Sequence, residues 1–186
     1  MRENFGQKTW LYPMPVLIIC AYDENGVPNA MNAAWGGISE ENEISICISE
    51  DHKTTYNIIK SKAFTISIGE ECNVIECDYL GIETGNKVEN KLERASLTTT
   101  KSEFVNAPII NEFSMALECE LISYNPETCT LKGKIKNISI DEKVLGENGK
   151  LSLEKFKPIT YDPVNHNYIA LGKIVGNAFK DGLKLK

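Results

Sequence analysis

Short runs with a strand-like pattern recur along this chain and leave little room for helices. One run, at residues 16–22, is almost entirely apolar. Regular alternation of apolar and polar side chains marks three others, at residues 44–49, 63–68 and 129–140. An apolar run suits a strand buried on both faces, and alternation suits a strand with one buried face. Because these runs are regularly spaced and separated by turn residues, they predict a mainly β fold, an antiparallel barrel with a few short helices.

The arm that follows the first of these runs carries unusually small side chains. Asn25 and Gly26 stand between two strand-like runs, which is a strong signal for a hairpin. The second arm, residues 28–37, reads Pro-Asn-Ala-Met-Asn-Ala-Ala-Trp-Gly-Gly, where a buried strand would carry Val and Ile. Small side chains let a ligand approach the backbone, Asn amides can bond its edge, and Trp35 adds a flat face.

This arm therefore predicts a backbone cradle for a planar polar ligand. The glycine pair at its end lets the chain turn away, because glycine tolerates conformations that other residues avoid. Tight packing of one strand against another is the alternative, and on spacing alone it is the more common cause of such a pattern.

A polar helix start follows the cradle in the sequence. We expect Asp51 to cap a helix there, and the first N–H groups of a helix are unpaired and lie at its partly positive end. Lys53, Thr54 and Thr55 add charge and hydroxyl groups at the same place. This combination suits a phosphate group. An ordinary capped helix with polar residues in its first turn is the alternative.

Two further groups of charged residues could carry chemistry. Glu118 and Glu120 lie on the polar face of the strand predicted for residues 113–124, with no histidine nearby, so we expect both to be solvated rather than catalytic. The polar stretch at residues 81–92 is typical of a ligand-facing insertion. Lys91 in this stretch is a candidate second charge for an anionic ligand, and a solvated helix face is its alternative.

Composition limits the partners and the compartment. The chain has 186 residues and a net charge of −6, which suits one domain with a buried core and argues against nucleic acid. The sequence has no apolar run long enough to span a bilayer and no apolar signal-peptide core, so we expect a cytoplasmic protein without a membrane partner. Its six cysteines form no Cys-x-x-Cys pair and only two histidines are present, so no metal site is expected.

Four blocks of the sequence resemble the flavin reductase-like, FMN-binding split-barrel proteins, a family that includes the flavoredoxins. The blocks lie at residues 13–16, at 26–35, at 54–58 with 62–66, and at 79–82 with 84–85 and 90–92. The second block is the most specific. The family often has Asp-Pro-Pro after its Trp-containing segment, where this chain has Ser-Glu-Glu-Asn-Glu at residues 39–43. The family often has an Arg or Lys just before its phosphate-binding threonine. This chain reads His-Lys-Thr-Thr at residues 52–55, so the choice between Thr54 and Thr55 stays open.

The resemblance implies a single flavin reductase-like FMN-binding domain over residues 1–186. Its expected fold is a six-stranded split β-barrel, and its expected assembly is a homodimer with FMN near the interface. The residues assigned to the cofactor by the resemblance and the cradle together are Met31, Asn32, Ala33, Ala34, Trp35, Ser49, Lys53, Thr54, Thr55 and Lys91.

The activity that the resemblance implies is that of an FMN-dependent oxidoreductase. NADH or NADPH would pass hydride to FMN, which would reduce free flavin, ferric iron or another acceptor. The chain has no Gly-x-Gly-x-x-Gly unit, so the nucleotide would bind only transiently. No catalytic side chain is expected, because the cofactor performs the chemistry. The alternative is a flavoredoxin-type electron carrier that serves a redox protein partner without direct NAD(P)H turnover.

Overall fold

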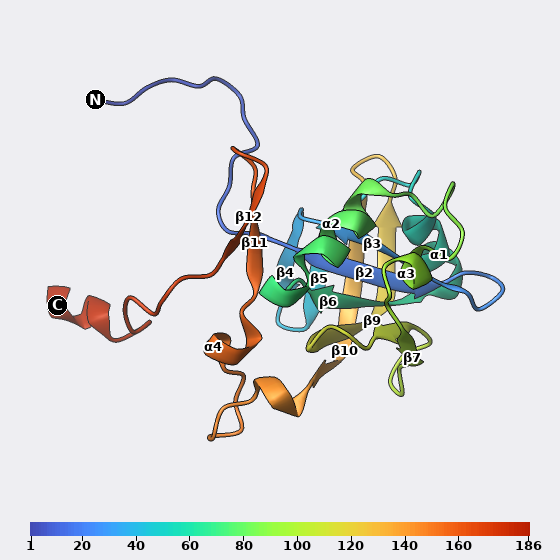
Figure 1. Ribbon diagram of the computed structural model, residues 1–186. Coiled ribbons are helices and arrows are strands. Elements are labelled where there is room, and N and C mark those ends of the chain that lie inside the picture. The colour runs from blue at the N-terminus through green and yellow to red at the C-terminus, as the bar shows by residue number, and fades with distance from the viewer.

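The computed structural model describes all 186 residues, and its main feature is one curled antiparallel sheet (Figure 1). The sheet has seven strands, which neighbour one another in the order β3-β2-β6-β9-β10-β5-β4. Their bounds in chain order are β2 (Leu17–Tyr22), β3 (Pro28–Ala33), β4 (Gly36–Glu40), β5 (Glu43–Cys47), β6 (Ala63–Ile68), β9 (Met115–Asn125) and β10 (Thr130–Ile140). The predicted antiparallel, barrel-like sheet is confirmed, with one strand more than the expected six.

A short connection forces this sheet to curl. Strands β3 and β4 are its two edges, yet only residues 34 and 35 separate them along the chain. That link spans roughly 10 Å when fully extended. In a flat sheet, six spacings between neighbouring strands would hold the edges roughly 29 Å apart. The sheet must therefore curve until its edges approach each other, and the segment around Trp35 bridges them.

Two small sheets and short helices surround the main sheet. Strand β11 (Ile159–Asp162) pairs with β1 (Met14–Pro15) and β12 (Asn167–Ala170), and β7 (Thr99–Lys101) pairs with β8 (Pro108–Ile110). The helices are α1 (Lys53–Ser61), α2 (Val74–Ile82), α3 (Lys91–Arg94) and α4 (Leu153–Phe156), with 3-10 turns η1 (Glu71–Asn73), η2 (Glu142–Val144) and η3 (Asp181–Leu185). No helix is long and apolar enough to cross a bilayer.

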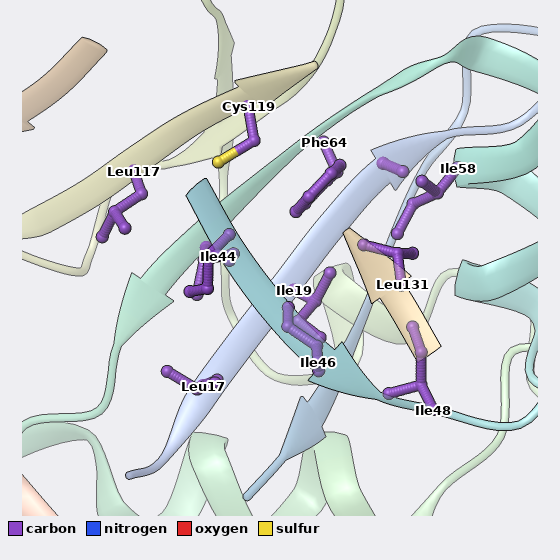
Figure 2. Packing of buried hydrophobic residues seen from close by; sticks show 12 residues of the cluster. Leu17, Ile19, Ile44, Ile46, Ile48, Ile58, Phe64, Leu117, Cys119 and Leu131 are labelled. Carbon is purple, nitrogen blue, oxygen red and sulfur yellow. The ribbon is translucent and has the colours of Figure 1, made fainter. Parts of the chain in front are cut away.

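Strand β2 is buried on both faces, as its apolar sequence predicts. Leu17 and Ile19 point inside the curl, where they pack with Phe64 of β6 and the isoleucines of β5 (Figure 2). Ile18 on the opposite face of β2 packs in a second cluster, with Leu80 of α2 among others. Strand β2 therefore joins two cores and fixes the position of its neighbour β3, the edge strand that α2 contacts.

The prediction that the glycine pair after Trp35 lets the chain turn away is wrong. The pair begins β4, and the backbone at Gly36 passes close to its neighbours. A Cβ atom on Gly36 would lie 2.9 Å from Cδ1 of Leu17 and 3.1 Å from the carbonyl oxygen of Ser45. Only glycine fits at Gly36 without a shift of these neighbours, whereas a Cβ atom on Gly37 would meet nothing within 4 Å.

The expectation for Glu118 is wrong, while Glu120 is exposed as predicted. Glu118 is 1% exposed, accepts a 2.7 Å hydrogen bond from the side-chain amide of Asn137, and is also bonded by the hydroxyl of Ser102. Buried carboxylates are tolerated where such donors satisfy them. The polar face of β9 at this position is covered by the loop that carries Ser102, which a strand pattern alone does not reveal.

Candidate functional site

A cavity of about 590 Å³ lies beside the bare strand β3. Its wall comes from β3 and the segment around Trp35, from the end of β5, from the start of α1, and from residues 80–85 at the end of α2. This volume falls within the range of roughly 300–1,000 Å³ that is usual for small-molecule sites. The lining mixes apolar, polar and cationic groups, which suits a ligand with a flat ring and a charged tail.

The structure brings nine of the ten predicted site residues to this one cavity. They come from separate parts of the chain: Met31, Asn32, Ala33, Ala34, Trp35, Ser49, Lys53, Thr54 and Lys91. Thr55 is the exception, because consecutive residues of a helix point about 100° apart. It is fully buried on another side of α1, and its hydroxyl has no hydrogen-bond partner. Of the two threonines, only Thr54 reaches the cavity.

Small side chains leave the backbone of β3 open along the cavity. Ala33 and Ala34 are partly exposed there, and Trp35 beyond them is 53% exposed. Asn32 turns toward α2 and donates a 2.9 Å hydrogen bond from Nδ2 to the carbonyl oxygen of Cys77. Its Nδ2 also lies 3.4 Å from the hydroxyl of Tyr168. The wall therefore presents accessible peptide groups, held in place by contacts behind the strand.

The N-terminus of α1 opens onto the same cavity. The helix begins at Lys53 and its N-cap residue is His52, so the expectation that Asp51 caps it is wrong. Asp51 lies one residue too early, and its carboxylate instead accepts a 3.4 Å hydrogen bond from the hydroxyl of Ser49. With no side-chain cap and no acidic residue in its first turn, this helix end favours an anion. Lys53 adds a positive charge beside it.

Asn29 connects the strand wall to this helix end. Its side-chain amide donates a buried 2.7 Å hydrogen bond to the hydroxyl of Thr54. Asn29 also packs closely against Gly85, where a Cβ atom would collide with its side-chain oxygen. Gly85 therefore belongs to the site because it leaves room for the Asn29 amide.

Lys91 is buried beneath the cavity rather than on a solvated helix face. Its ammonium donates two hydrogen bonds of 2.9 Å, to the carbonyl oxygens of Ala30 in β3 and Leu80 in α2. Burial lowers the pKa of Lys91 to about 8, and the nearby Glu83 opposes this shift. The side chain thus fixes α2 and α3 against the cradle strand and brings a buried positive charge to the wall.

A sequence match over most of the chain identifies its family. The sequence model of the flavin reductase like domain matches residues 9–163 of this chain. The chain belongs to the flavin reductase-like family. The fold of this flavin reductase-like protein resembles the flavoredoxin of Desulfovibrio vulgaris (Miyazaki F), with a TM-score of 0.93 and 34% sequence identity over 98% of this chain and 100% of that one.

Two further solved structures share the fold of this flavin reductase-like chain at lower identity. The flavoredoxin of Methanosarcina acetivorans has a TM-score of 0.89 and 23% identity, and the match covers 100% of both chains. Nitrilotriacetate monooxygenase component B of Bacillus cereus has a TM-score of 0.77 and 23% identity, covering 90% of this chain and 89% of that one. The predicted resemblance to the flavin reductase-like split barrels is therefore confirmed.

Sequence reasoning missed several residues that line the cavity of this family member. Asn29 lies within the predicted cradle but is not among the predicted cofactor residues, although its amide matches that of Asn32 in type. Gly81 and Gly85 belong to the polar insertion that was expected to face a ligand. Cys47 and Cys129 also line the cavity, and no local pattern marks them, because they meet only through strand pairing.

Proposed function

We propose that this flavin reductase-like chain binds FMN in the cavity and acts as an oxidoreductase that passes electrons through it. The observation that carries the proposal is the meeting of an open strand backbone with a cationic, uncapped helix start in one cavity. A flavin ring needs a flat wall with accessible peptide groups, and its phosphate needs N–H donors and positive charge. The two requirements are separate, and this cavity satisfies both.

In this proposal each end of FMN has its own residues. Met31, Asn32, Ala33 and Ala34 line the ring, with Trp35 at its edge. Ser49, Lys53 and Thr54 hold the phosphate at the start of α1, where the donor set is one that a phosphate prefers. Lys91 acts as a positioning residue, since its two carbonyl contacts hold β3 against α2.

A bound FMN would supply the hydride and electron transfer that protein side chains cannot perform. The chain's own residues bind and orient the cofactor. The buried Lys91 ammonium keeps positive charge behind the ring wall, and the hydroxyl of Thr54 accepts from Asn29 so that its own proton can point to a phosphate oxygen. No side-chain acid or base is required.

NADH or NADPH is the proposed electron donor, bound only transiently over the flavin. The test is to add each nucleotide anaerobically to the FMN-loaded protein and to follow the visible flavin absorbance. We expect the absorbance of oxidised flavin to fall rapidly after the nucleotide is added. It should return when free flavin or ferric iron is added as an acceptor. Flavin that stays oxidised in excess nucleotide would contradict the reductase proposal and leave FMN binding intact.

The second candidate is an electron carrier of the flavoredoxin type. It is favoured by the likeness to the Desulfovibrio vulgaris flavoredoxin, which extends over 98% of this chain. A carrier would accept electrons from a reduced ferredoxin but not from NADH or NADPH. Running both donors against the same preparation separates the two candidates, because each predicts bleaching with only one class of donor.

We also propose that the protein is a homodimer. Residues 1–13 and 171–186 lead away from the curled sheet (Figure 1), and they carry large apolar side chains that are strongly exposed, among them Phe5, Leu11, Val175 and Phe179. Exposed apolar surface of this kind marks an interaction site. Light scattering during gel filtration should give twice the 20.7 kDa of one chain, and a monomer at micromolar concentration would contradict the proposal.

A further inference from the structure

Two cysteines stand together on the wall of the cavity. Cys47 is the last residue of β5, and Cys129 directly precedes β10 at the end of the hairpin that links β9 to β10. Both line the cavity. The other four cysteines do not: three of them are buried in the cores, and Cys72 is exposed on η1. The proposed FMN site therefore has one pair of thiols beside it, from the end of β5 and from the hairpin that leads into β10.

Strand pairing holds the two cysteines next to each other. Cys47 pairs with Thr130 across the antiparallel ladder of β5 and β10. One step further, the backbone N–H of Ile48 donates a 2.8 Å hydrogen bond to the carbonyl oxygen of Cys129. The sulfur of Cys47 lies 3.9 Å from the carbonyl oxygen of Thr128, whose carbon is bonded to the nitrogen of Cys129. The Cys47 thiol thus contacts the peptide group that leads into Cys129.

The backbone of Cys129 lets its side chain leave the regular alternation of a strand. Neighbouring positions on paired strands would otherwise point to opposite faces of the sheet. Cys129 has a φ of 52°, in the left-handed region, so its side chain is not bound to that alternation. The sulfur of Cys129 lies 3.8 Å from the carbonyl oxygen of Pro126, within the same hairpin.

The spacing of the two backbones suits a disulfide. Directly paired residues of an antiparallel ladder have Cα atoms about 4.5–5.5 Å apart, and second diagonal neighbours about 7–8 Å. Cys47 and Cys129 are offset by one residue, so their separation falls between these values. Disulfides span Cα separations of about 4.4–6.8 Å, so the spacing of the two backbones lies within the reach of a disulfide.

We propose that Cys47 and Cys129 are a redox-active dithiol that closes to a disulfide on the cavity wall and exchanges two electrons with the bound flavin. This inference rests on the proposed FMN binding. When the disulfide forms, two S–H bonds break and one S–S bond forms. Two electrons pass to oxidised flavin, which takes up one of the two protons, and the other proton goes to solvent. The reverse step returns both electrons to the sulfur atoms.

Exposure distinguishes this pair from the core thiols. Cys47 is exposed and Cys129 is partly exposed, so external disulfides can reach them for thiol–disulfide exchange. Burial raises the pKa of Cys77 and of Cys119 to about 12, which leaves almost no thiolate at neutral pH. The reduced pair could therefore pass electrons from the flavin to disulfide substrates at the protein surface.

The first test asks whether the bond forms, and it does not depend on flavin. The full-length protein is stripped of any flavin and oxidised with glutathione disulfide. It is then alkylated in denaturant and digested without reductant. We expect a peptide in which Cys47 and Cys129 are linked, which is absent from Cys47→Ser and retained in the matched control Cys72→Ser. Both residues recovered as alkylated thiols, or only as separate glutathione adducts, would overturn the proposal.

The second test asks whether the bond communicates with the flavin. The oxidised, FMN-loaded protein is titrated anaerobically with dithionite while flavin absorbance and free thiols are measured. We expect the wild type and Cys72→Ser to take up about twice the reducing equivalents per flavin that Cys47→Ser takes up, with two thiols appearing per chain. Equal uptake in all three proteins would overturn the exchange with flavin. A protein that binds no FMN would fail here but still answer the first test, so the two failures are distinguishable.

Discussion

Asn29 and Thr54 are joined by a buried 2.7 Å hydrogen bond that runs from the side-chain amide of Asn29 to the hydroxyl of Thr54. The bond connects β3, the proposed wall for the flavin ring, to the first turn of α1, the proposed phosphate site. It fixes the distance between the two ends of the cavity. The two threonines at this helix start have different roles, because only Thr54 both lines the cavity and makes this contact.

The first prediction concerns this bond. Thr54→Val keeps the shape of the side chain but removes the acceptor for Asn29 and the donor for phosphate. Leaving a buried amide unsatisfied should lower the free energy of unfolding by about 1–3 kcal/mol. The affinity for FMN should fall more than that for riboflavin, which has no phosphate. Calorimetric titration and thermal unfolding measure both effects.

Thr55→Val is the matched control for this prediction. The Thr55 hydroxyl is buried without a partner, so its removal should leave FMN affinity unchanged and should not reduce stability. Thr54→Ser should recover most of the lost affinity. If Thr55→Val weakens FMN as much as Thr54→Val does, the phosphate does not bind where we propose.

The second prediction tests the cradle by filling it. Ala33→Leu places a branched side chain on the partly exposed wall of the cavity. We expect the folded protein to lose bound flavin, because the ring and the new side chain would occupy the same space. Flavin content after purification and far-UV circular dichroism measure the two properties. Ala170→Leu is the control, since Ala170 is exposed on β12 outside this cavity, and equal flavin content in both variants would contradict the cradle.

The third prediction concerns Gly85. A methyl group at this position would collide with the side-chain oxygen of Asn29, so Gly85→Ala should displace that amide and break its bond to Thr54. We expect FMN binding to weaken about tenfold or more, which corresponds to roughly 1.4 kcal/mol. Gly37→Ala is the control, because a Cβ atom there meets nothing within 4 Å. Equal FMN affinities for the two variants, measured by fluorescence titration, would show that Asn29 does not shape the site.

Most of the fold could be read from local patterns. The Asn25–Gly26 hairpin forms as expected, with Gly26 at a φ of 78° and the Asp23 carboxylate accepting from the N–H groups of Asn25 and Val27. The second arm of this hairpin also forms a strand as expected, β3, which covers its first six residues. These features depend on residues close in the sequence, where turn chemistry and alternation act directly.

Features that depend on distant residues could not be read in this way. Glu118 is buried because Asn137 and Ser102 satisfy it, and neither lies near it in the sequence. The cavity cysteines are brought together by pairing between β5 and β10, which are more than eighty residues apart. Strand β4 does not follow from the local pattern, because a glycine pair indicates a turn, whereas the close approach to Leu17 requires Gly36 in a strand.

The fourth prediction is a pH dependence of stability that comes from Lys91. Its pKa is lowered by burial from 10.5 to about 8 in the folded chain, so between pH 8 and 10.5 the unfolded chain binds more protons than the folded one. Stability therefore rises with pH in this window, by about 1.4 kcal/mol for each unit of pKa difference. Below pH 8 both states are protonated, and the Lys91 contribution is constant.

Comparison with Lys91→Met isolates this effect from the other groups that titrate at alkaline pH. The difference in unfolding free energy between wild type and variant should increase from pH 8 to 10.5, as measured by urea denaturation of the flavin-free proteins. The variant should be less stable throughout, because the carbonyl oxygens of Ala30 and Leu80 lose their donor. A difference that does not change with pH would mean that Lys91 stays charged in the folded chain.

The most direct measurement of FMN binding is a visible absorption spectrum of the full-length protein, purified and then equilibrated with excess FMN and desalted. We expect the two bands of oxidised flavin, close to one flavin per chain, and release of FMN rather than riboflavin on denaturation. A preparation that remains colourless after this treatment would contradict the proposal that the open backbone of β3 and the start of α1 form a flavin site.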